Sequence, residues 1–182
     1  MSDTTIKYGT AEALAFVNGT GVDATGRTIE DYFNFDADKW EECHNHVQWA
    51  FPSHIPSRFN PDAPVVDMAD FANGLSVQGH KNINRLLDAY LASLGFTGYR
   101  FDPSSPRNAI WLTPYNHNYQ RISRILNLLA WIDPELALAL LNEFLTAAQS
   151  VANQYVQNER GVAPFITVET VVYWSKAAIG GL

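Results

Sequence analysis

One histidine and two arginines are the side chains of this sequence that are best suited to binding a ligand, and we call them the arginine row. If residues 116–129 are helical, His117, Arg121 and Arg124 lie along one stripe of that helix. Two guanidinium groups one turn apart can hold a carboxylate or a phosphate through paired hydrogen bonds. The same arginines would have a structural role if they paired with acidic side chains of adjacent helices. The row therefore predicts either an anion site or an internal ion-pair network.

A second group of chemically capable side chains consists of Cys43, His44 and His46. On a helix only Cys43 and His46 are close enough to share a metal ion, and no Cys-x-x-Cys or His-x-x-x-His pair completes a site. We therefore expect no metal and no cofactor. We expect His44 to face inward, where it is either a hydrogen-bonded core residue or a neighbour of the arginine row.

Catalytic signatures are weak in this chain. No Gly-x-Ser-x-Gly elbow is present, and no nucleophile has a recognisable base beside it. We therefore expect no catalytic residue. The alternative is a small hydrolase or transferase that acts on an anionic substrate, with His44 or His117 as the acid or base.

The element that must position His44 is predicted to be one helix over residues 36–51. Asp36 can cap its N-terminus, and Pro52 disfavours α conformation in the residue before it. His44 then lies in an apolar stripe and Trp49 lies on the opposite side of the helix. Trp49 is expected either to be covered on both sides or to face a partner. The stripe consists of Trp40, Cys43, Val47 and Phe51.

Other helix boundaries are also marked. Capping residues stand at Thr28, Asp67 and Asp133, and Gly95 supplies a C-terminal stop. A last helix is expected over residues 168–178. The pattern predicts an all-α protein: a compact single-domain helical bundle of about six to eight helices with long loops, spanning residues 1–182.

Composition excludes several classes of partner. The net charge of −7 and the pI near 5.1 argue against nucleic acid and anionic membranes. The N-terminus lacks the order of a signal peptide, and no apolar run is long enough to span a bilayer. We therefore expect a soluble, cytoplasmic protein with no nucleic acid partner and no membrane insertion, and leave its oligomeric state open.

Two segments resemble a known family. Residues 44–52 are similar to the His-Asp-Tyr-Ile-Gln-Trp-Leu-Phe-Pro signature of the opioid growth factor receptor conserved domain, and residues 117–126 resemble its His-Asn-x-x-Arg-Ile-Thr-Arg-Ile-Leu segment. Gly26-Arg27-Thr28 resembles a further family segment, and the resemblance runs from about residue 10 to 145. The shared positions that we select as candidate ligand-binding residues are His44, Gln48, Trp49, His117, Asn118, Arg121 and Arg124.

The resemblance implies a non-enzymatic ligand- or peptide-binding domain. Animal members of the family are described as receptors for an opioid pentapeptide and carry long C-terminal extensions. This chain resembles instead the stand-alone domain of microbes and their viruses. We hypothesise that the two helices pack together and that the candidate residues line a polar cleft for a peptide or a small anionic ligand. A buried polar network and a protein-interaction module, dimeric through an exposed aromatic patch such as Trp49, are the alternatives.

Overall fold

The computed structural model describes residues 7–157 and 166–182 and divides into two compact units, Met1–Tyr90 and Leu91–Leu182. The all-α prediction is confirmed: the described residues form ten helices, and their only β pairing is two isolated bridges. Ten exceeds the six to eight helices predicted, because several connections contain a helix of one or two turns.

The first unit holds six helices, and the last of them, α6, ends just beyond the unit boundary. Helix α1 packs against α4 and α5, and the buried side chains of this unit combine large aromatic rings with aliphatic groups. The helices are α1 (Thr10–Val17), α2 (Ile29–Phe33), α3 (Ala37–Glu42), α4 (Val47–Ala50), α5 (Met68–Gly74) and α6 (Val77–Ser93).

The capping residues read from the sequence begin the expected helices. Thr28 Oγ1 accepts a hydrogen bond from the Asp31 N–H, and the Asp31 side chain bonds back to the Thr28 N–H, which completes a capping box at α2. Asp36 and Asp67 accept the corresponding N–H groups at the starts of α3 and α5. Local side-chain chemistry therefore fixes where these short helices start.

The single helix predicted over residues 36–51 is wrong, because the chain breaks between α3 and α4. Cys43 is extended, with ψ of 131°, and the chain becomes helical again after His46. On one continuous helix Trp40 and Trp49 would point to opposite sides, since nine residues make two and a half turns. The break turns both indoles inward, and each is only 1% exposed. Burying two tryptophans therefore outweighs the helical hydrogen bonds lost at the break.

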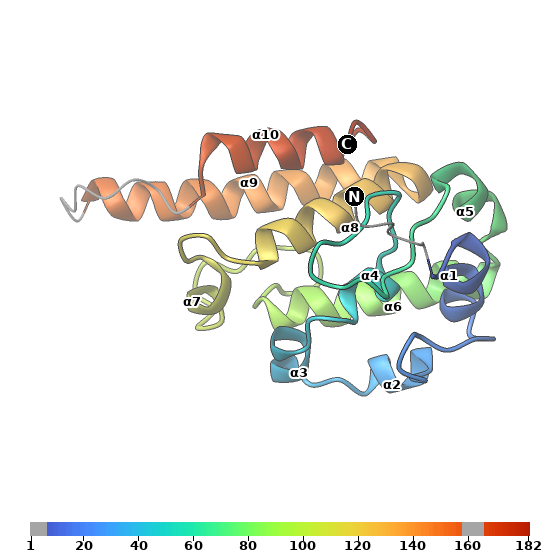
Figure 1. The fold of residues 1–182 in the computed structure, drawn as a ribbon. Helices are drawn as coiled ribbons and strands as arrows, with labels where there is room; N and C mark the ends of the chain where they lie inside the picture. Colours follow the sequence, from blue (N-terminus) through green and yellow to red (C-terminus); the bar gives the residue numbers. More distant parts are fainter. Residues whose placement is uncertain (1–6, 158–165) are drawn as a thin grey trace. The chain divides into compact units, whose positions relative to one another are not determined.

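The second unit is built around α8, α9 and α10, which pack against one another. Figure 1 shows α9 and α10 running side by side. Asp133 Oδ1 accepts a hydrogen bond from the Leu136 N–H at the start of α9, which confirms Asp133 as the predicted capping residue. The helices are α7 (Asn108–Trp111), α8 (Asn118–Ile132), α9 (Pro134–Gln157) and α10 (Val168–Ala177).

Gly95 ends α6 with a left-handed residue, as predicted. Its φ is +94°, and the Phe96 N–H bonds to the Leu91 carbonyl in the pattern of a Schellman cap. A Cβ at this position would overlap the Ser105 side chain.

We expect Gly95→Ala to destabilise the protein by about 1–3 kcal/mol, because the substitution adds steric overlap to backbone strain. Urea unfolding measures this loss. Gly98→Ala is the matched control: Gly98 also has a positive φ, +57°, but an added Cβ meets nothing within 4 Å. Equal losses for the two variants would show that the contact with Ser105 is unimportant.

Candidate functional site

A buried carboxylate organises the region before α2. Asp23 is 4% exposed. Its Oδ1 accepts hydrogen bonds from the N–H and the hydroxyl of Thr25 and from the N–H of Arg27. Its Oδ2 accepts from the Tyr32 hydroxyl at 2.8 Å and from Arg27 Nε at 2.6 Å. Burial alone would raise the pKa of Asp23, but these hydrogen bonds outweigh it, so the pKa lies below its ordinary value. Asp23 is therefore an ionised anchor for the Arg27 side chain.

Arg27 is held at both ends of its guanidinium. While Nε bonds to Asp23, Nη2 donates to Asn45 Oδ1 at 2.9 Å, in the segment between α3 and α4. The guanidinium also lies over the rings of Tyr32 and Phe35, 5.2 and 5.9 Å from their centroids. A cation fixed in this way loses little side-chain entropy when it binds an anion.

The ring of Phe35 separates a buried aromatic cluster from the surface. On its inner side the cluster contains Tyr32, Trp40 and His46; the Phe35 centroid is 4.9, 5.7 and 5.5 Å from the centroids of their rings. His46 is fully buried there. The Tyr32 ring stacks on Phe35, and the rings of Trp40 and His46 pack edge to face against it. Because these neighbours hold the Phe35 ring in place, it forms a rigid wall of the adjacent surface.

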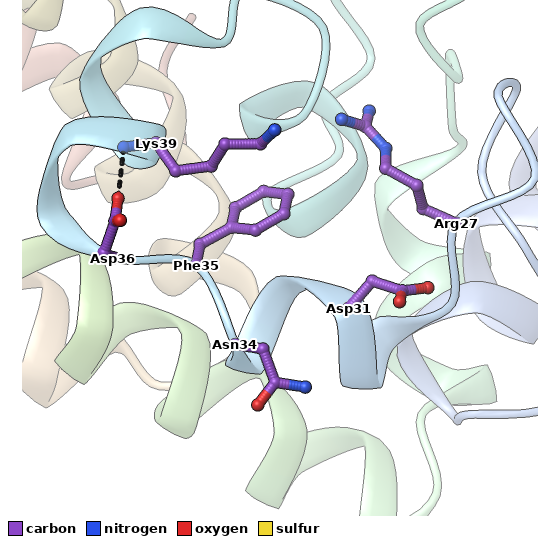
Figure 2. A pocket seen from close by; sticks show the side chains of 6 residues that line it. All are labelled: Arg27, Asp31, Asn34, Phe35, Asp36 and Lys39. Atoms are coloured by element: carbon purple, nitrogen blue, oxygen red, sulfur yellow. Dashed lines mark hydrogen bonds between the residues drawn. The ribbon is translucent and has the colours of Figure 1, made fainter.

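An open pocket of about 400 Å³ lies above this ring. Its volume is in the range of sites for small ligands. Figure 2 shows the side chains that line it, which come from α2, from α3 and from the chain on either side of α2. They are Arg27, Asp31, Asn34, Phe35, Asp36 and Lys39.

The two cations of the pocket converge, whereas its two carboxylates are used elsewhere. Lys39 Nζ lies 5.7 Å from the Phe35 centroid, and Figure 2 shows its end directed toward the guanidinium of Arg27. Asp31 bonds to the N–H and hydroxyl of Thr28, and the backbone N–H bond lowers the Asp31 pKa. Asp36 accepts the N–H of Lys39. The pocket therefore presents the ammonium group of Lys39 beside a guanidinium whose charge is already paired with Asp23.

The predicted site residues of the first unit do not share this pocket. His44 is exposed, and its Nδ1 lies 2.6 Å from the Glu42 carbonyl oxygen, so the expectation that it faces inward is wrong; His46 is the buried histidine. Trp49 is also in the core, where its ring packs against Tyr8 and Phe16. An exposed aromatic patch at Trp49 is therefore excluded.

Gln48 has a positioning role in the loop after α4. Its Oε1 lies 3.5 Å from Asn60 Nδ2 and its Nε2 lies 3.5 Å from Ser57 Oγ. Ser57 Oγ also accepts the N–H groups of Phe59 and Asn60, and Asn60 Nδ2 lies 3.4 Å from the Asn45 carbonyl oxygen. The polar side chain of the signature segment thus ties the loop to the segment that holds Arg27.

The predicted site residues of the second unit lie at the start of α8. His117 is exposed and precedes the helix, whereas Asn118 is fully buried and Arg121 is 8% exposed. Arg121 Nη1 donates to Asn118 Oδ1 at 3.3 Å. Burial lowers the pKa of Arg124 to about 10, so this side chain is still cationic at neutral pH. The structure thus brings Asn118 and Arg121 together, while the shared cleft with the first unit stays a prediction.

Sequence reasoning did not select Arg27, Phe35 or Lys39. The available signals were that Gly26-Arg27-Thr28 resembles a family segment and that Lys39 opens the stretch leading to the signature. Neither signal shows that the two cations meet over one ring, because that depends on the loop conformation that Asp23 sets.

Within the described ranges, no three His, Cys, Asp or Glu side chains are grouped so that they could hold a metal ion. Among the described helices, none combines the length and the apolar character needed to cross a bilayer.

Comparison with known proteins supplies one match. Neither the curated proteins nor the solved structures contain a significant match to this chain. A scan against protein families matches residues 16–166 to the family described as the opioid growth factor receptor (OGFr) conserved region. The matched range takes in the Asp23–Arg27 network, the Phe35 pocket and all seven predicted site residues. Because the match spans most of the sequence, the chain belongs to the opioid growth factor receptor conserved-region family.

Proposed function

We propose that this protein is a non-enzymatic binding domain that takes a small anionic or peptide-like ligand in the pocket above Phe35. The observation that carries the proposal is the convergence of Arg27 and Lys39 over one aromatic ring. A carboxylate or phosphate between these cations would gain charge-assisted hydrogen bonds. An apolar group attached to the anion would pack on the ring of Phe35.

The two cations have different parts in this proposal. Arg27 is already oriented by Asp23 and Asn45, so it supplies directional hydrogen bonds. Lys39 is exposed, and within the residues that the structure describes its ammonium group is in no ion pair. Its flexible stem lets it follow ligands of different size.

Thermal unfolding against a ligand panel tests the proposal. The panel contains phenyl phosphate, sugar phosphates, nucleotides, short peptides that include an opioid pentapeptide, and divalent metals. A ligand at about 100 times its dissociation constant stabilises the folded state by roughly 2.7 kcal/mol, which raises Tm by several degrees. We expect a rise with one anionic class.

Lys39→Ala should reduce that rise to below half while leaving the Tm without ligand nearly unchanged, since exposed substitutions alter stability by about 0.5 kcal/mol or less. Lys81→Ala is the matched control, because Lys81 is also exposed and lies on α6, outside the pocket. If the rise survives in Lys39→Ala and disappears in a folded Arg121→Ala variant, the arginine row of α8 is the site and this pocket is not.

A further inference from the structure

Helix α10 carries apolar side chains on its outer face as well as on its inner one. The inner face, which packs on α8 and α9, buries Trp174 and Ala177. On the outer face, Val168 and Val172 are one turn apart, and Ile179 follows two turns later; they are 76%, 45% and 73% exposed. We call these three residues the apolar stripe of α10. A helix at the surface normally has polar side chains there, whereas a helix that is apolar on two sides is typically covered on both.

Two exposed aromatic side chains extend this surface. Tyr173 follows Val172 on α10, and Trp131 of α8 adjoins the end of the stripe, since a Cβ added to Gly180 would lie 3.5 Å from Trp131 Nε1. Exposed apolar surface of this kind marks a contact with a protein or a membrane. A helix that lies on a membrane carries several Lys or Arg residues on its polar face. Helix α10 has one Lys and one Glu, in a chain with a net charge of −7, so its charges favour a protein partner.

The two charges of α10 indicate which protein that partner is. Glu169 lies in the first turn and Lys176 in the last, and both are exposed. Because seven residues make almost two full turns, the two side chains lie on one side of the helix, beside the apolar stripe. A two-fold contact pairs residue i of one copy with residue j of the other. Two antiparallel α10 helices therefore place each Glu169 opposite Lys176 of the other copy, with Val172 near the axis, whereas parallel helices would oppose like charges. The charge order of α10 is thus complementary to itself.

We infer that the apolar stripe of α10 is the contact surface of a homodimer in which α10 packs antiparallel against α10 of a second copy. Burial of the stripe drives the association, and the two Glu169–Lys176 pairs at its border set the direction of the helices. A helix of ten residues is only about 15 Å long, so the surface it buries is small compared with that of a permanent dimer. The association is therefore reversible and concentration-dependent. This inference is independent of the Phe35 pocket, which lies in the first unit.

Sedimentation equilibrium of the full chain from about 1 to 500 µM tests the inference. We expect the wild-type protein to populate a dimer in this range. Val172→Asp should raise the dissociation constant at least about tenfold, because it replaces a buried contact near the axis by two carboxylates that face each other. Val77→Asp is the matched control, since Val77 is an exposed valine at the start of α6, outside the stripe, and this change should leave the dissociation constant unaltered.

Charge reversal tests the antiparallel arrangement. Glu169→Lys and Lys176→Glu should each raise the dissociation constant at least about fivefold, and the double variant should return it to within about twofold of the wild-type value, because it restores both pairs. Circular dichroism at a concentration where every variant is monomeric shows that the proteins compared are folded. A wild-type protein that stays monomeric throughout the range overturns the inference. So does a folded Val172→Asp variant that dimerises as the wild type does, or a double reversal that associates as weakly as the single ones.

Discussion

Replacing Asp23 by asparagine should lower the free energy of unfolding by roughly 3–5 kcal/mol, because it removes the charge that a partly buried guanidinium faces. Asp23 accepts hydrogen bonds from Thr25, Arg27 and Tyr32 while it is 4% exposed. The Arg27 side chain would be left with a neutral partner that cannot accept all of them. Urea unfolding at pH 7 measures the loss.

The control for Asp23 is Asp62→Asn. Asp62 pairs with Lys7 at 3.0 Å, but both side chains are largely exposed, at 45% and 60%. Surface pairs of this kind contribute at most about 1 kcal/mol. Comparable losses in the two variants would contradict the structural role that we assign to Asp23.

The loss at Asp23 should also depend on pH. Because the folded-state pKa of Asp23 is lowered, its stabilising contribution is present above the unfolded value of about 3.9 and is lost as pH falls through the folded value. The difference in unfolding free energy between wild type and Asp23→Asn should therefore narrow below about pH 4. A difference that stays constant down to about pH 2 would show that the carboxylate charge is not what stabilises the fold.

Replacing Trp49 by alanine should destabilise the protein by about 3–5 kcal/mol, the cost of a large core cavity. Trp49 is 1% exposed, and its ring lies 5.2 Å from that of Tyr8 and 5.7 Å from that of Phe16. Trp131→Ala is the matched comparison. Because Trp131 is 44% exposed, its replacement should lower the free energy of unfolding much less. Chemical unfolding of both variants gives the two values.

The Trp49 result also decides between two readings of the family signature. If Trp49 serves the core, the variant that remains folded at low temperature should bind the anionic ligand as the wild type does. If Trp49→Ala keeps full stability but loses binding, Trp49 faces the ligand, as helical periodicity alone suggested.

Capping chemistry made the helix starts predictable. Thr28, Asp36, Asp67 and Asp133 each accept an N–H in the first turn of the helix that they precede, because this interaction involves only residues three apart. The left-handed Gly95 was predictable for the same local reason. Both features depend only on residues a few positions apart, so the sequence alone is enough to predict them.

The break at Cys43 was not predictable from periodicity. A helical wheel assumes that each residue is rotated by the same angle from the one before it. One extended residue therefore changes the direction in which all later side chains point. His44 and Trp49 were therefore assigned to the wrong sides, while His46 went unnoticed as the core histidine. The decisive energy comes from rings distant in sequence, among them Phe16 and Tyr32, that bury the residues after the break.

The pocket above Phe35 was beyond prediction for a related reason. Its cations stand twelve residues apart on different elements, and Arg27 points there only because Asp23 and Asn45 hold it. Hydrogen bonds between loops carry no periodic signal in the sequence. The arginine row of α8 was visible because its residues repeat along one helix.

The most direct test of the central claim is an NMR titration of ¹⁵N-labelled protein with phenyl phosphate at low ionic strength. The ligand joins an anion to an aromatic ring, the two groups that the pocket accommodates. We expect saturable shifts of the Arg27 Nε–Hε signal and of the backbone amides from Phe35 to Lys39, with at least tenfold weaker binding in Lys39→Ala. Saturable shifts confined to residues outside the pocket, or wild-type affinity in Lys39→Ala, would contradict an anion site over Phe35.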